Sequence, residues 1–466
     1  MQRIFAIAGL TWKAALRFKL FLVITALLLI AVIGLPLVIK DDGTAEGFTQ
    51  IILTYTLSAI TALLGLSTIW LSCGTLARDI EECQIQVVVT KPIARWQIWI
   101  GKWLGIVTLN AVLLLISGAF VFGLLEYRAS KLPAAVQQKL HTDILVARGA
   151  AKEADMTAMI DEETAREFTA RMAQSSVEKV DEAEVKKIIR AQVKAAVEQV
   201  PPGYFSRPWQ IDLGFAKNSL ADKPLQLRIK FNGAERTLSG TFTLMLQAGD
   251  PKSGKVWRSE PMSLAPSTES EQVFHEIPIP ANLFDSSGVL TIIAYNPNNT
   301  ALSFPLEDGM EVLYPDGGFA PNFARGLGII FCWLALMAAL GLMAASFLSF
   351  PVAAFFSLTM LVVVFSSGTL ADAIDSGSVA AGNEETGVAG HSVMDVVLIP
   401  AFKALLSVIR LVQNFSPVDA LSTGRCITWT ELGLAFTQIV LVIGGIFAVM
   451  GIYFFSRREL ATAQTQ

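Results

Sequence analysis

The sequence is poor in charge for its length. Only 16% of its 466 residues are Asp, Glu, Lys or Arg, while 53% are hydrophobic, and soluble domains carry about 25% charged residues. The mean hydropathy is +0.52. This scarcity of charge argues against a soluble enzyme and indicates an integral membrane protein in contact with the lipid bilayer. The net charge is −4, and no cluster of Lys and Arg suggests a nucleic-acid partner.

Cysteine and histidine are also scarce, with four and three copies. The cysteines lie in or beside apolar runs or in a short charged loop, so no disulfide framework is predicted. The histidines are isolated from one another and from any cysteine pair, which leaves no metal-ligand spacing. We therefore expect no metal or cofactor on this chain. These residues are Cys73, Cys83, Cys332, Cys426, His141, His275 and His391.

Charge is missing altogether from six apolar segments. Each is about as long as a helix needs to be to cross a bilayer, roughly 20 residues. The segments are 20–39, 50–73, 104–125, 326–350, 351–370 and 432–455, with Pro351 dividing one long apolar run into two spans. Proton- or sodium-coupled carriers need ionisable residues inside the membrane. Their absence from these segments favours an external energy source.

Basic residues near the span ends orient the chain, because Lys and Arg favour the cytoplasmic side. Three basic regions fall on one side if there are six spans. They comprise Arg3, Lys13, Arg17 and Lys19, then Arg78, Lys91, Arg95 and Lys102, and finally Arg457 and Arg458. Both termini are therefore expected in the cytoplasm, and the polar block 126–322 outside it.

The segment 395–413 is apolar enough for a seventh span. However, Lys403, Ser407, Arg410 and Asn414 recur at helical spacing and form a polar stripe. This pattern favours a helix that lies in the membrane interface or re-enters between spans. A seventh span is the alternative, and it would place Arg457 and Arg458 outside the cell.

The polar block divides into two regions that differ in composition and in hydrophobic pattern. Residues 126–203 are rich in Ala, Glu, Lys, Gln and Arg and predict two or three helices. Residues 204–322 contain alternating runs at 225–231, 241–246, 273–279 and 289–295, separated by Gly- and Asn-containing turns, which predict an antiparallel β-sandwich. The block is either a rigid stalk or cap, or a platform for a substrate or a partner.

The expected fold is thus a membrane all-α bundle of six transmembrane helices with an inserted extracytoplasmic α + β-sandwich domain. The expected divisions are 1–125, which includes a cytoplasmic loop at 74–103, then 126–203, 204–322 and 323–466.

One stretch imitates a nucleotide-binding loop. Gly249, Gly254 and Lys255 match most of a P-loop pattern, but Val256 stands where a hydroxyl should bind magnesium. The stretch also joins two expected strands and does not open a helix. We interpret it as a hairpin loop, so the chain has no nucleotide site of its own.

The loop between the second and third spans is the most distinctive part of the sequence. Its first part is expected to form a short helix with a charged face, and Lys-Pro ends that helix. Such an element can lie in a groove on a cytoplasmic partner, although a simple topogenic loop is the alternative. The residues concerned are Arg78, Asp79, Glu82, Lys91, Pro92, Arg95, Gly101 and Lys102.

In this order of features the chain resembles the type-2 permeases of ATP-binding-cassette (ABC) transporters, especially the bacterial group with an enlarged outer domain. A charged helix is followed by Thr-Lys-Pro, by Arg95, and by Gly-Lys at the start of the third span. Other matching features are the basic amphipathic segment 1–19, the turn 348–353, the stretch 414–417 and the closing stretch 455–460.

The resemblance implies an exporter subunit in the bacterial inner membrane. Two permease subunits, as a homo- or heterodimer, would work with two cytoplasmic ATPase subunits that bind ATP and Mg²⁺. Arg78, Asp79 and Glu82 would form the coupling helix that receives the ATPase motion. Lys91, Pro92 and Arg95 would position that loop, and Gly101 and Lys102 would shape the mouth of the third span.

The outer block departs from the family pattern, because it is far larger than the usual short loops. This leaves two alternatives beside the exporter. The chain could transmit motion to its outer domain, or act as an assembly scaffold, without passing a substrate. It could also be a membrane-anchored binding or sensor protein that has no ATPase.

Overall fold

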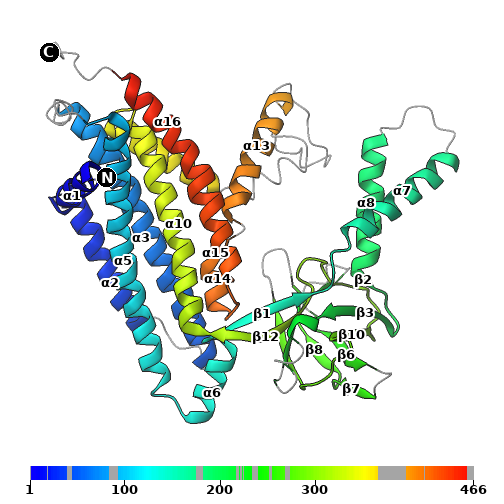
Figure 1. Cartoon of the computed structure of the whole chain (residues 1–466). Coiled ribbons are helices and arrows are strands. Elements are labelled where there is room, and N and C mark those ends of the chain that lie inside the picture. The colour runs from blue at the N-terminus through cyan, green and yellow to red at the C-terminus, as the bar shows by residue number, and fades with distance from the viewer. Residues whose placement is uncertain are drawn as a thin grey trace. The chain divides into compact units, whose positions relative to one another are not determined.

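The computed structural model shows two compact units, Met1–Ala147 with Gly317–Gln466, and Arg148–Asp316. We call them the helical unit and the inserted unit. Their ribbons are drawn in Figure 1. The structure describes residues 2–17, 19–38, 45–82, 93–174, 182–216, 220, 223, 225–233, 240–250, 254–267, 273–365, 395–413 and 415–458.

Apolar sequence runs form long helices in the helical unit. Its first part contains α1 (Gln2–Arg17), α2 (Lys19–Val38), α3 (Ala45–Glu81), α5 (Arg95–Ala129) and α6 (Ala134–Asp143). Its second part contains α10 (Phe319–Ala345), α11 (Phe350–Phe365), α13 (Asp395–Gln413), α14 (Pro417–Ser422), α15 (Trp429–Ala435), the π-helix η2 (Phe436–Ile443) and α16 (Gly444–Arg457). α15, η2 and α16 follow one another without a break.

Among the described residues, four helices are long and apolar enough to cross a membrane: Gly47–Glu81, Arg95–Ala129, Phe319–Ala345 and Trp429–Arg457. They indicate a membrane protein, as the composition predicts. The pair Gln2–Arg17 and Phe21–Pro36, bent by 75°, supplies a fifth if it is counted as one span. α11 has only 16 residues. Helix length and apolarity in the described residues therefore do not establish the expected count of six spans.

Buried leucine, isoleucine and alanine side chains hold the helical unit together. α10 lies at its centre, in contact with α3, α5, α11 and α16, and most of its apolar residues are buried. One core cluster joins Leu53 and Leu57 of α3 to Ile329 and Ile330 of α10. Between helices that cross a membrane, it is the van der Waals packing of such side chains, and not their removal from water, that favours association.

The described part of the inserted unit contains the helices α7 and α8 and nearly all of the strand residues. Only the first two residues of β1 and the last two of β12 belong to the helical unit. In chain order the inserted unit has β1 (Val146–Lys152), α7 (Thr157–Gln174), α8 (Glu182–Glu198), β2 (Gln199–Val200), β3 (Phe205–Asp212), the 3₁₀ turn η1 (Gly214–Ala216), β4 (Leu225–Ile229) and β5 (Asn232–Gly233). It continues with β6 (Phe242–Asp250), β7 (Lys255–Arg258), β8 (Met262–Leu264), β9 (His275–Ile279), β10 (Val289–Asn296), β11 (Leu302–Ser303) and β12 (Met310–Gly318).

These strands form three sheets. One has the order β1-β12-β4-β9, the second has β3-β10-β6-β7 with β8 paired to β6, and the small third has β2-β11-β5. Side chains of β10 alternate between buried and partly buried positions, which is the pattern of a strand with one face on a core. Leu227 of β4 and Ile292 of β10 lie in the same apolar core, so the two larger sheets share it.

The strand positions agree with the alternating runs of the sequence, since β4, β6, β9 and β10 fall within or across them. Two expectations need correction. Residues 126–203 are not helical throughout, because β1 pairs there with β12. The expected division between residues 125 and 126 falls inside α5, and the compact inserted unit begins at Arg148.

The stretch that imitates a P-loop joins β6 to β7. These strands are antiparallel, with Gly249 opposite Val256 and Asp250 opposite Lys255. Gly249 has φ +120° and Gly254 has φ +72°, values that glycine adopts readily and other residues rarely. The glycines therefore serve the turn of a hairpin, as the sequence predicts.

Candidate functional site

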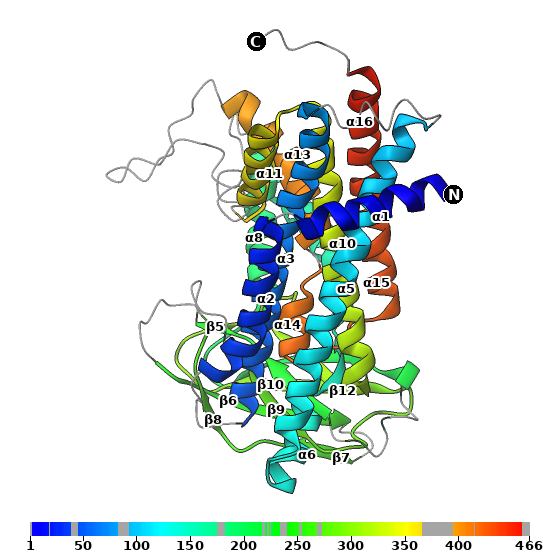
Figure 2. The ribbon, with the colours of Figure 1, turned by 90° about the vertical axis from the view of Figure 1, so that its left-hand side faces the viewer.

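The candidate site lies at the end of the helical unit where α3 ends and α5 begins. Figures 1 and 2 show that α1 begins and α16 ends at this same end of the unit, and that the turn from α10 to α11 lies there too. We call this set of helix ends the polar end. It contains most of the residues that the sequence assigns to coupling.

An ion pair links the last turns of α3 to the first turns of α5. The Lys102 Nζ donates to Asp79 Oδ2 at 2.6 Å and to the Thr75 carbonyl at 2.8 Å. The Lys102 side chain is only 8% exposed and that of Asp79 is 34% exposed. Because a buried ammonium without a partner is costly, this pair and the carbonyl hold the two helix ends together.

The same end of α3 also contacts the start of α11. The Phe350 backbone N–H donates to Glu81 Oε1 at 2.9 Å, so a carboxylate lies at the N-terminus of α11, where the helix dipole favours negative charge. The Arg78 guanidinium lies 4.6 Å from the centre of the Phe350 ring, within cation–π distance. The turn between α10 and α11 is thus attached to α3.

Arg95, the first residue of α5, contacts the end of α16. Its Nη1 lies 2.7–3.1 Å from the carbonyl oxygens of Phe455, Ser456 and Arg458. The last carbonyls of a helix have no partner within it, and a guanidinium there also complements the helix dipole. Arg458 in turn donates from Nη1 to the Ser346 carbonyl at 3.3 Å, at the end of α10.

Two glycines of α5, Gly101 and Gly105, lie against α1. A Cβ added to Gly101 would lie 2.7 Å from the Ile7 Cβ, and one added to Gly105 would lie 2.8 Å from the Thr11 Cβ. Trp12 Nε1 donates to Thr108 Oγ1 at 3.0 Å beside this contact. The absent side chains let α1 pack directly on the α5 backbone, so Gly101 serves the contact with α1.

Arg78, Asp79, Arg95 and Lys102 therefore come together at one end of the helical unit. The expected short helix is the end of the 37-residue α3. Glu82 follows it and is exposed, whereas Lys91 and Pro92 lie outside the described residues. Docking of these residues on an ATPase stays a prediction.

The sequence reasoning missed the partners of these charges. Lys102 contacts Thr75, and the N-terminus of α11 contacts Glu81. Arg78 contacts Phe350, and Ser346 contacts Arg458. Glu81 had a local signal, because it stands beside Asp79 at a helix end. Phe350 and Arg458 belong to stretches that the sequence singles out, but nothing local indicates their contacts, since each meets residues more than one hundred positions away in the chain.

The segment expected in the interface forms α13, with Pro400 inside it. Lys403 is exposed, while Leu406 and Ile409 are buried at 6% and 3% exposure, and α13 contacts η2. The side chain of Arg410 lies outside the described residues. The helix has one buried apolar side and an exposed lysine, and its place in a membrane interface stays a prediction.

The described residues contain no group of three His, Cys, Asp or Glu that could hold a metal ion. His275, for instance, has its Nε2 2.8 Å from the Ala265 carbonyl oxygen. Among the described residues of the polar end, no nucleophile is paired with a base, and the ionic groups connect helix ends. Its geometry suits mechanical connection between α3, α5, α11 and α16.

Family models, curated proteins and solved structures were compared with the chain, and none matches.

Proposed function

We propose that the chain is the membrane-spanning permease subunit of an ABC exporter, driven by a separate cytoplasmic ATPase that binds ATP and Mg²⁺. In this proposal it has six spans, counting α2 and α11, and both termini lie in the cytoplasm of a bacterial cell. The inserted unit is an antiparallel sandwich with helices, on the other side of the inner membrane. Two permease subunits form the transporter.

The observation that carries the proposal is the connectivity of the polar end. Before residues 83–92, Glu81 joins the end of α3 to α11. After them, Arg95 joins the start of α5 to α16, and Lys102 joins it to α3. A push on this loop would reach the two halves of the bundle through short hydrogen bonds. This is what a coupling element between an ATPase and the spans requires, and the resemblance to type-2 permeases assigns that role to the same stretch.

The experiment is purification of the tagged full chain from its native membranes, followed by a test for ATP hydrolysis. We expect a copurifying ABC ATPase whose activity changes when the permease is present. Glu82→Arg reverses an exposed charge at the loop and should weaken this association. Glu162→Arg is the matched control, because Glu162 is an exposed residue of α7, in the inserted unit, with 76% of its side chain accessible.

Association that is weakened by Glu82→Arg and unaffected by Glu162→Arg would support the proposal. A chain that purifies from native membranes without any ATP-hydrolysing partner would overturn it in favour of a membrane-anchored binding or sensor protein.

A second function is favoured by one observation. β12 ends at Gly318 and α10 begins at Phe319, so the central helix of the bundle continues directly into a strand of the inserted unit. Movement of α10 would therefore pull on that strand. ATP-driven motion of the inserted unit without passage of a substrate is the alternative, and it predicts ATP hydrolysis that changes protease cleavage of the inserted unit but drives no transport.

A further inference from the structure

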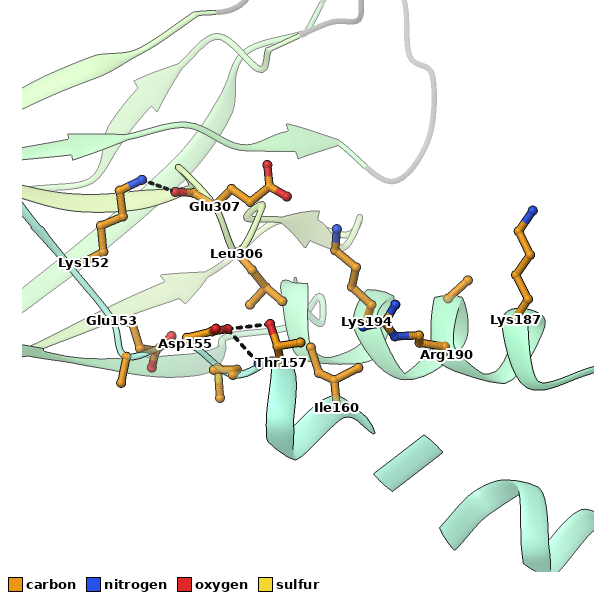
Figure 3. A pocket seen from close by; sticks show the side chains of 13 residues that line it. Lys152, Glu153, Asp155, Thr157, Ile160, Lys187, Arg190, Lys194, Leu306 and Glu307 are labelled. Atoms are coloured by element: carbon orange, nitrogen blue, oxygen red, sulfur yellow. Dashed lines mark hydrogen bonds between the residues drawn. The ribbon is translucent and has the colours of Figure 1, made fainter. Parts of the chain in front are cut away.

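The inserted unit contains an open cavity between α8, the start of α7 and the end of β1. Its volume is about 600 Å³, within the range of about 300–1,000 Å³ that small-molecule sites occupy. Figure 3 shows Lys152 on one side of the cavity, with Lys187, Arg190 and Lys194 following one another along α8 on the other. All four line the cavity.

The three α8 cations face the same way for a reason visible in the sequence. They stand at intervals of three and four residues, and such residues share one face of a helix. From Lys187 to Lys194 the helix rises about 10 Å, at about 1.5 Å per residue. A single carboxylate or chloride cannot span that row, whereas an anion with several charged groups can.

Three carboxylates line the cavity: two of them, Glu153 and Asp155, are already engaged, and Glu307 is the third. Glu153 pairs with Arg207 at 2.9 Å, and both side chains are largely buried. Asp155 accepts hydrogen bonds from the Thr157 hydroxyl and backbone N–H at the start of α7. The bond from the hydroxyl, followed by that from the backbone, lowers the pKa of Asp155, which keeps it an acceptor at this turn.

The cations of α8 are engaged only weakly. Arg190 pairs with Asp161 at 2.9 Å, but more than half of each side chain is exposed, and Lys194 lies 3.7 Å from Glu198. An exposed pair such as Arg190–Asp161 contributes little to stability, and the Lys194–Glu198 contact is long although Glu198 is largely buried. Within the described part of the chain, no carboxylate forms an ion pair with Lys187. An incoming anion could therefore recruit these groups at small cost.

The cavity also has an apolar part, formed by Met156, Ile160, Ala191 and Leu306. We propose that this cavity binds a small organic polyanion, with several phosphate or carboxylate groups on the α8 cations and its apolar part against Ile160 and Leu306. Lys187, Arg190 and Lys194 are the binding residues. Lys152 lies on the opposite side, where its Nζ already pairs with Glu311 at 3.1 Å and donates to the Glu307 carbonyl. This goes beyond the permease function and does not depend on it, because the site lies wholly within the inserted unit.

The test is calorimetric titration of the purified full chain in detergent with tripolyphosphate and with citrate, and with glucose as the neutral probe. At least one of the two polyanions should bind once per chain, with an affinity that falls as salt is added, and glucose should not bind. Lys187→Gln with Lys194→Gln should weaken binding about tenfold. Lys187→Arg with Lys194→Arg should preserve it.

The matched control is Lys223→Gln with Lys255→Gln, which removes the same charge from the inserted unit at residues that do not line the cavity. It should change the affinity less than twofold. Absence of binding by both polyanions, or equal weakening in the control, would overturn the proposal. Because no ATPase enters this experiment, its failure leaves the permease proposal untouched, and failure of that proposal leaves this one untouched.

Discussion

Lys102 and Asp79 lie 23 positions apart in the chain and meet at 2.6 Å, with the lysine almost fully buried and the aspartate one-third exposed. The pair joins the end of α3 to the start of α5, the two helix ends next to the stretch to which the resemblance assigns the coupling role. Asp79 therefore has a structural role, the pairing with Lys102, in addition to any role in docking a partner. Reversal of its charge would set two cations side by side and disturb the fold itself.

The first prediction concerns this pair. Asp79→Asn leaves the Lys102 ammonium with the Thr75 carbonyl alone, so we expect a loss of about 1–3 kcal/mol, between the values for exposed and for buried pairs. Addition of Lys102→Met should recover part of it. A double-mutant cycle on the free energy of unfolding in detergent measures the coupling. Strictly additive effects would show that the pair contributes nothing.

The control for this cycle is Asp161→Asn. Asp161 pairs with Arg190 at a similar distance, but both side chains are more than half exposed. We expect a change of at most about 0.5 kcal/mol there.

The second prediction concerns the contact of α1 with α5. In Gly105→Ala the new Cβ would lie 2.8 Å from the Thr11 Cβ and 2.9 Å from the Ala8 carbonyl oxygen. Because α1 would have to move away, we expect destabilisation by about 1–3 kcal/mol. Gly123→Ala, on the same helix with open space around it, should be neutral or stabilising by at most about 1 kcal/mol. Equal effects at both glycines would contradict the packing argument.

The third prediction concerns topology. Six spans with both ends in the cytoplasm place Glu82 and the C-terminus inside and Asp161 outside. Single cysteines at these positions, in a chain with Cys83 and Cys426 replaced by serine, should react with a membrane-impermeant reagent accordingly, since Cys73 and Cys332 are buried. External labelling of the C-terminus would restore the seventh span at α13.

The fourth prediction concerns nucleotide. The stretch with Gly249, Gly254 and Lys255 joins antiparallel strands, and Lys255 Nζ donates to Asn282 Oδ1 at 3.1 Å. We expect the purified chain to show no binding of MgATP in calorimetry and no hydrolysis, because a P-loop needs a helix N-terminus and a magnesium-binding hydroxyl. Stoichiometric binding that is lost in Lys255→Ala would contradict this interpretation.

Much of the fold could be predicted because its signals are local. The apolar runs that become α3, α5 and α10 extend without interruption, and the alternating run that becomes β10 has the period of a strand with one buried face. β1 was missed because its short run contains three alanines and a glycine, only one β-branched residue, Val146, and no aromatic residue, whereas β-branched and aromatic residues distinguish a strand. Its partner β12 stands more than 150 residues further along.

The sequence by itself determined that the chain is apolar enough for a membrane, that its charges lie outside the six apolar segments, and that a β-rich insertion separates those segments into two groups. Only the tertiary structure decided how those charges are used. Arg95 contacts carbonyls 360 positions away, Asp79 neutralises Lys102, and Lys152 lies across a cavity from α8. Such pairings depend on how helices and sheets pack, and no periodicity in the sequence encodes which distant groups come within hydrogen-bonding distance.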